Sequence, residues 1–119
     1  MSQPEEFRGR TKRFALRVIR LFRSLPRTEE ARIVGRQVLR SGTSVAANYR
    51  ALCRARSKAE FIAKMGTVIE EADETVFWLE LLVEAGIVPE DKMKSLLVEA
   101  NELTAIFVAS RKTATSRTR

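Results

Sequence analysis

Apolar residues recur at intervals of seven along residues 57–85, and this pattern is the strongest constraint on the fold. An α-helix brings residues seven apart onto the same side, so each set forms a row along the helix. Because three such rows are adjacent, they make a wide apolar face, and we expect this helix to be mostly buried. The rows are Phe61, Val68, Thr75 and Leu82; Ile62, Ile69, Val76 and Val83; and Met65, Ala72 and Leu79.

Signals at both ends bound this helix. Ser57 and Glu60 form a capping-box pattern directly before the apolar run. Gly86 follows the last turn, where glycine is common because it adopts positive φ without strain. The chain has only 5 glycines and 3 prolines, and all three prolines fall at expected helix boundaries, which favours an all-α fold.

Three further segments have helical spacing, and none of the sequence alternates as a strand does. The first covers about residues 11–24. The second covers about 29–54 and follows Thr28, a good N-cap residue. The last begins at Pro89 and fades near Lys112. Since connections of about 2 to 5 residues separate these segments, neighbouring helices must be antiparallel.

We therefore expect an all-α fold, an antiparallel up-down-up-down four-helix bundle over residues 11–112. Residues 1–10 are expected to form a flexible N-terminal segment and residues 113–119 a flexible basic tail. The sequence has no signal-peptide pattern and no apolar run of about 18 residues. Cys53 is the single cysteine, so no intrachain disulfide can form. These features predict a cytoplasmic protein.

Residues 40–49, RSGTSVAANY, are unusually small and polar for a helix interior. Gly42 costs about 1 kcal/mol relative to alanine there, which predicts either a bend or a close approach by a neighbouring helix. We expect the approaching helix to be the 57–85 helix. Residues equally far from the turn at Arg56 lie opposite each other, which places Arg40 opposite the acidic run of the next helix. We define the polar seam as Arg40, Ser44, Asn48, Glu70, Asp73 and Glu74.

The acidic run allows two interpretations. Glu70 lies one turn from both Asp73 and Glu74, and paired carboxylates could bind a hard cation or act as acid and base. An arginine facing them favours structural ion pairs instead. The chain has no histidine and no nucleotide-binding glycine motif, which excludes His-dependent catalytic triads and most zinc sites. We therefore expect a protein that is not an enzyme, with no catalytic residue, no metal and no cofactor.

Positive charge is concentrated in the first half of the chain. The net charge is +7, while residues 1–56 carry +10 and residues 57–88 carry −5. Arginine supplies 13 of the 14 basic residues of the first half, and its planar group makes bidentate contacts to phosphates. This favours RNA or DNA binding through backbone charge; the alternative is a set of solvated helix faces. The candidate contacts are Arg10, Arg13, Arg17, Arg20, Arg32, Arg36, Arg50 and Arg54.

Few aromatic residues are available for a surface. Most phenylalanines fall at core spacing, which leaves Tyr49 and Trp78 as candidates for stacking on bases, too few for sequence-specific reading of a single strand. Phe77 and Trp78 lie in the stretch VFWLELLV, residues 76–83, which is more apolar than one side of a bundle requires. We expect these two residues to form an oligomer interface.

The run from Leu39 to Val88 resembles the four-helix-bundle family of the 23S ribosomal RNA intervening-sequence proteins, and the similarity covers about residues 14–109. The residues that carry it are Arg40, Ser44, Asn48, Ser57, Glu60, Phe61, Glu74, Leu79, Glu80, Leu81 and Gly86.

This resemblance implies a subunit that assembles into a ring-like homopentamer and whose function is poorly defined. Some genes of this type lie inside intervening sequences of ribosomal RNA genes. A structurally similar accessory protein of diversity-generating retroelements is a basic pentameric barrel that works with nucleic acid and a reverse transcriptase. The expected partners are thus further copies of this chain, and RNA or DNA. The alternative is a protein-interaction or scaffold module with no affinity for nucleic acid.

Overall fold

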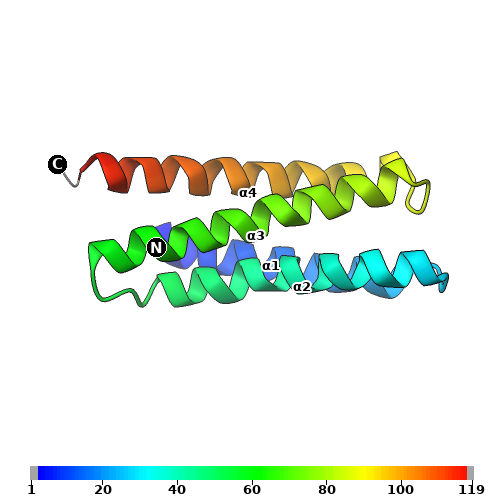
Figure 1. The fold of residues 1–119 in the computed structure, drawn as a ribbon, viewed down its shortest axis with the longest axis horizontal. Coiled ribbons are helices and arrows are strands. Elements are labelled where there is room, and N and C mark those ends of the chain that lie inside the picture. Colours follow the sequence, from blue (N-terminus) through cyan, green and yellow to red (C-terminus); the bar gives the residue numbers. More distant parts are fainter. Residues whose placement is uncertain (1–2, 118–119) are drawn as a thin grey trace.

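The computed structural model describes residues 3–117, which form four α-helices and, within that range, no strand. This confirms the all-α, four-helix prediction (Figure 1). Residues 1–2 and 118–119, which belong to the two segments expected to be flexible, lie outside the described residues. The helices are α1 (Gln3–Ser24), α2 (Glu29–Leu52), α3 (Lys58–Glu84) and α4 (Glu90–Ser116).

The expected helix boundaries near Thr11 and Lys112 are wrong, because α1 begins at Gln3 and α4 continues to Ser116. The first turn of α1 carries Glu5 and Glu6, whose negative charge stabilises a helix N-terminus. One turn on, Phe7 is buried against the rings of Tyr49 and Phe107, with centroids 6.3 and 6.5 Å away. This packing holds the start of α1 in place.

The predicted caps of the middle helices are confirmed. The hydroxyl of Thr28 accepts a hydrogen bond from the amide of Ala31 at 3.3 Å, and that of Ser57 accepts one from the amide of Glu60 at 3.1 Å. Gly86 follows α3 with a φ of 74°. These local interactions explain why the two turns lie where the sequence places them.

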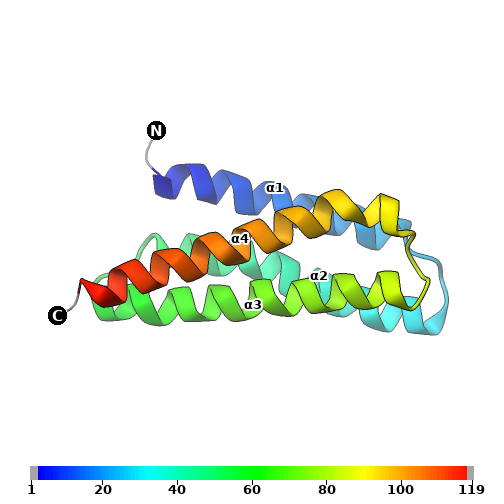
Figure 2. The same ribbon diagram turned by 90° about the horizontal axis from the view of Figure 1, so that it is seen from above.

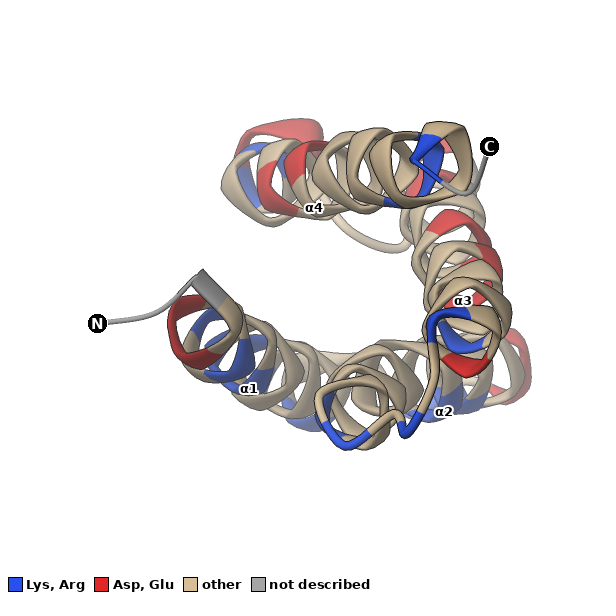
Figure 3. Ribbon diagram, turned by 90° about the vertical axis from the view of Figure 1, so that its left-hand side faces the viewer, with Lys and Arg blue, Asp and Glu red and all other residues tan. Residues whose placement is uncertain are grey.

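Successive helices run antiparallel, and the four lie side by side in chain order in a body of 50 × 23 × 21 Å (Figures 1 and 2). Each packs closely on the next, whereas α1 and α4 approach each other much less, so that the bundle is most open between them (Figure 3). All buried polar side-chain atoms of the described residues have a hydrogen-bond partner.

The inner side of α2 is a strict succession of buried residues at alternating intervals of four and three. Two of them are glycines that face α1. A Cβ atom on Gly35 would lie 2.6 Å from Leu25 Cδ1, and one on Gly42 would lie 2.8 Å from Val18 Cγ2. The predicted close approach at Gly42 is confirmed, but the neighbour is α1 rather than α3. The full row is Ala31, Gly35, Val38, Gly42, Val45, Tyr49 and Leu52.

Side-chain contacts of Arg10 and Arg17 close the open side at the middle of the bundle. The Nε and Nη2 atoms of Arg10 each donate to Glu99 at 2.8 Å, and Nη2 also donates to Glu102 at 2.9 Å. Arg17 donates to the Ser95 hydroxyl at 2.9 Å. The hydrogen bond from Arg10 lowers the pKa of Glu99 below its ordinary value of 4.5, since it stabilises the carboxylate.

We expect Gly42→Ala to lower the free energy of unfolding by about 1–3 kcal/mol, because the added methyl group would overlap Val18 and force the helices apart. Gly66→Ala is the matched control. A Cβ atom there would meet only the flexible side chain of Arg111, at 3.4 Å, so this variant should gain about 0.5–1 kcal/mol from helix propensity. Urea unfolding at one protein concentration measures both; equal effects would contradict the close approach.

Arg10→Gln should lower the free energy of unfolding by about 0.5–1 kcal/mol at neutral pH, with Arg20→Gln, an exposed arginine of the same helix, as its control. Because the folded-state pKa of Glu99 is depressed, the stabilisation is complete above pH 4.5 and is lost as the pH falls through that lower pKa. Wild type and variant should therefore converge in acid. A difference that is independent of pH would show that Arg10 acts through packing instead.

Candidate nucleic-acid interface

A buried hydroxyl pair lies at the centre of the α2–α3 contact. Ser41 and Thr75 are fully buried, and their Oγ atoms are 2.8 Å apart. Thr75 Oγ1 also lies 2.7 Å from the backbone carbonyl of Glu71. Since the Thr75 hydroxyl has a single proton, both contacts are hydrogen bonds when Thr75 donates to the Glu71 carbonyl and the Ser41 hydroxyl donates to Thr75 Oγ1. This pair joins the two helices in one register.

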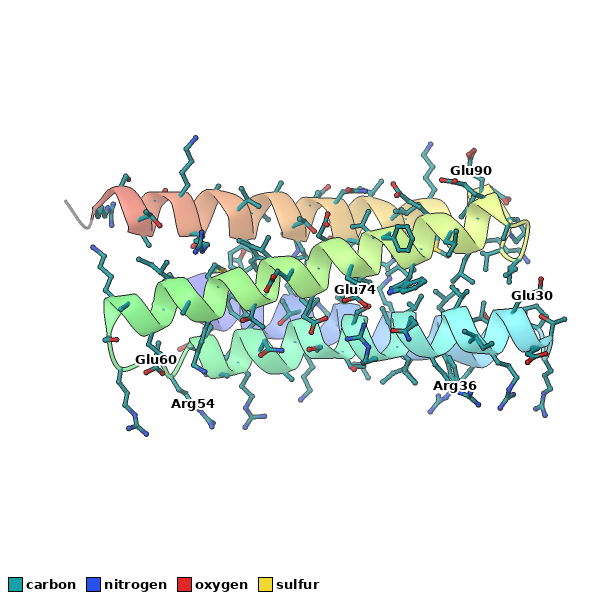
Figure 4. The ribbon with its side chains drawn as sticks, in the orientation of Figure 1. Glu30, Arg36, Arg54, Glu60, Glu74 and Glu90 are labelled. Carbon is teal, nitrogen blue, oxygen red and sulfur yellow. The ribbon has the colours of Figure 1, made fainter. Side chains whose placement is uncertain are left out.

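Part of the predicted polar seam forms beside this pair, and its acidic residues are Glu71 and Glu74. Arg40 pairs with Glu74 and, at 3.4 Å, with Glu71. Ser44 donates to Glu71 at 3.2 Å, and Asn48 donates to the Ser44 hydroxyl at 2.8 Å. Figure 4 shows Glu74 on the side of α3 that faces α2. The seam is therefore a set of structural ion pairs and hydrogen bonds between two helices.

Glu70 and Asp73 do not belong to the seam. Both are exposed and have no ion pair with another described residue. Each precedes the acid that faces α2 by one position, and one position on a helix is a rotation of about 100°. That rotation turns Glu70 and Asp73 toward solvent, while the carboxylate of Glu74 also accepts a hydrogen bond from Trp78 Nε1 at 3.0 Å. Among the described residues, no group of acidic or cysteine side chains could hold a metal ion.

The arginine row of α1 divides between two environments. Both Arg10 and Arg17 contact α4, as described above: Arg10 forms ion pairs with its acids, and Arg17 donates a hydrogen bond to a neutral hydroxyl. Arg13 and Arg20 are exposed on the same side of the helix. The four side chains thus do not form one free row, and whether any of them binds nucleic acid stays a prediction.

A larger basic area covers the outward sides of α1 and α2. Figure 4 shows Arg36, on α2, and Arg54, in the turn that follows α2, projecting away from the rest of the bundle. No aspartate or glutamate occurs in residues 7–28 or 31–59, so neither helix supplies counter-charges there. We call this area the α1–α2 basic surface; its exposed residues are Arg8, Lys12, Arg23, Arg32, Arg36, Arg50 and Arg54.

Arg8, Lys12 and Arg23 were not among the predicted contacts. Their common signal was present in the sequence, as the two long runs that lack any carboxylate. By contrast, exposed acidic residues are most frequent on α3, which also holds Glu80 and Glu84. Figure 3 shows this separation, with blue mainly on α1 and α2 and red mainly on α3 and α4.

The two candidate interface aromatics differ in exposure. Phe77 is 52% exposed and packs edge-on against Trp78, with ring centroids 4.9 Å apart. Trp78 is partly buried against the core. Tyr49, the other candidate for base stacking, is only 6% exposed; burial, with a smaller contribution from Cys53, raises its pKa to about 12. Tyr49 is therefore a core residue, and the prediction that it could stack on a base is wrong.

Comparisons with known proteins agree on one relationship. A crystal structure of a protein of unknown function from Bacteroides thetaiotaomicron, assigned to the S23 ribosomal protein family, is 30% identical with a TM-score of 0.85. The match covers 93% of this chain and 99% of that one. None of the curated proteins matches. The described helices include none that is long and apolar enough to cross a membrane.

The family model described as the 23S rRNA-intervening sequence protein matches residues 6–109, which is most of the chain. That range includes the whole of the polar seam and nearly all of the four helices. The chain therefore belongs to the family of 23S rRNA-intervening sequence proteins.

Proposed function

We propose that this protein is not an enzyme and that it binds RNA or DNA through the α1–α2 basic surface, chiefly by contacts to backbone phosphates. The observation that carries the proposal is a set of seven exposed basic side chains on α1, α2 and the turn after α2. They lie within residues 7–28 and 31–59, which contain no carboxylate. Such a surface attracts a polyanion and releases its condensed counterions on binding.

The chemistry of this surface indicates low sequence dependence. Six of its seven residues are arginines, which make bidentate contacts to phosphate oxygens. No aromatic residue on α1 or α2 is exposed in the described range, so stacking on bases has no platform there. The name of the family refers to 23S ribosomal RNA and the structural relative is assigned to a ribosomal protein family, which agrees with RNA as the polyanion.

We also propose that the protein acts in the cytoplasm as a homo-oligomer, in the ring-like homopentamer that the family resemblance implies. Phe77 supports this, because an aromatic ring that is 52% exposed beside Trp78 is typical of a contact surface. The same observation favours the second candidate function, a scaffold module that assembles through this surface and has no affinity for nucleic acid.

A salt titration of RNA binding tests the proposal. Fluorescence anisotropy with a labelled RNA of mixed sequence should show binding at low salt and a linear fall of log K with log salt. Replacing three arginines by glutamine should lower the magnitude of the slope by roughly 2–3, about one for each lost phosphate contact. Glutamine keeps helix propensity, so the fold should persist. The substitutions are Arg36→Gln, Arg50→Gln and Arg54→Gln.

A triple variant of α4 is the matched control, since it removes the same charge from exposed positions outside the α1–α2 basic surface. Its slope should remain close to that of the wild type. Equal effects of the two triple variants would contradict a localised surface. If RNA does not bind even at low salt while light scattering shows a stable oligomer, the scaffold function is correct instead. The control substitutions are Lys92→Gln, Lys94→Gln and Lys112→Gln.

A further inference from the structure

A cavity lies at the end of the bundle where α1 begins and α4 ends. Beyond the contacts of Arg10, the two helices diverge toward the N- and C-termini (Figure 2). Figure 3 looks onto this end and shows no helix between them. The space is a cavity of about 880 Å³, lined by residues of all four helices and of the α2–α3 turn. Its volume lies within the range of ligand-binding sites, roughly 300–1,000 Å³.

The inner walls of this cavity are apolar. Leu52, Phe61 and Ile106 line it, and Tyr49 lies at its base. Tyr49 stacks on Phe107, with ring centroids 5.5 Å apart. A smaller space of about 120 Å³ continues from there between Phe61, Phe107 and the core. These walls offer aliphatic and aromatic surface to a ligand, and the hydroxyl-bearing residues Ser57, Ser110 and Thr113 also line the cavity.

Two basic side chains stand among the lining residues, Lys58 and Arg117, and none of the described lining residues is acidic. Lys58 is the first residue of α3, so the positive end of the helix dipole adds to its charge. Burial raises the pKa of the Cys53 thiol, and the positive charge of Arg8 opposes this rise. Arg8 therefore also adds positive potential near the cavity. The electrostatic environment therefore favours an anion over a cation.

We infer that this cavity binds a monomeric fatty acid, with the carboxylate at Lys58 and Arg117 and the alkyl chain along the inner walls. The aliphatic and aromatic side chains of the inner walls suit an alkyl chain, and the basic residues select a negative head group. The inference is independent of the proposed function, because Lys58 and Arg117 lie outside the α1–α2 basic surface.

Calorimetric titration with octanoate, decanoate and laurate, each below its micelle concentration, tests this inference. The affinity should rise about fourfold for each added methylene group, and dodecylammonium should bind much more weakly than laurate. Lys58→Glu should weaken laurate binding about tenfold. This exposed position begins a helix, where an acid is tolerated. Lys94→Glu, the same charge change on α4, should leave binding unchanged.

Cys53 reports where the ligand binds, since the only thiol of the chain lines the cavity. Laurate should slow the alkylation of Cys53 by N-ethylmaleimide. Ser110→Trp, whose indole ring occupies part of the cavity, should weaken laurate binding and reduce this slowing. Circular dichroism checks the fold of each variant. The inference is overturned by equal affinity for laurate and dodecylammonium, by laurate binding that leaves Cys53 unprotected, or by binding to anionic vesicles without binding of laurate monomers.

Discussion

The contact between α1 and α2 at Gly35 and Gly42 determines the arrangement of the other charged and apolar surfaces. A methyl group would overlap Leu25, the residue after α1, at Gly35 and Val18 of α1 at Gly42, so the two helices lie closer than larger residues would allow. Their outward sides therefore form one continuous area. Since residues 7–28 and 31–59 contain no carboxylate, that area carries positive charge that the two helices do not neutralise there.

The α2–α3 contact complements this arrangement. The buried pair Ser41 and Thr75 joins the helices at their centre, and Arg40 engages two acids of α3 beside it. A buried polar pair limits the alternative alignments, because a shifted register would separate the Ser41 hydroxyl from Thr75, its partner across the contact. The contact also keeps Arg40 and its acidic partners on the α3 side, apart from the arginines of the α1–α2 basic surface.

Local signals explain what the sequence could predict. Thr28, Ser57 and Gly86 act within one turn of their own positions, so the start of α2 and both ends of α3 followed from residue type and spacing. The sequence predicted the polar seam in part. Counting residues from the α2–α3 turn identifies the segment of α3 that lies opposite Arg40, but the position it gives is wrong by one residue. On a helix that error exchanges an acid that faces α2 for its exposed neighbour.

Features that depend on tertiary packing could not be predicted from the spacing of residues along a single helix. Arg10 and Arg13 share one helix side, yet only Arg10 contacts α4, since that depends on where Glu99 lies. The spacing did not predict the start of α1, because Phe7 packs there against Tyr49 and Phe107, which are distant in the chain. The cavity results from the divergence of α1 and α4, which no single helix pattern contains.

The most direct measurement is nuclear magnetic resonance of the arginine side-chain Nε–H groups during titration with RNA. If the α1–α2 basic surface is the interface, the signals of Arg36, Arg50 and Arg54 shift first, while that of Arg10, held by Glu99, stays in place. If the largest shift is that of Arg111 on α4, or if the Arg10 signal shifts as much as those of Arg36, Arg50 and Arg54, the α1–α2 basic surface is not the interface.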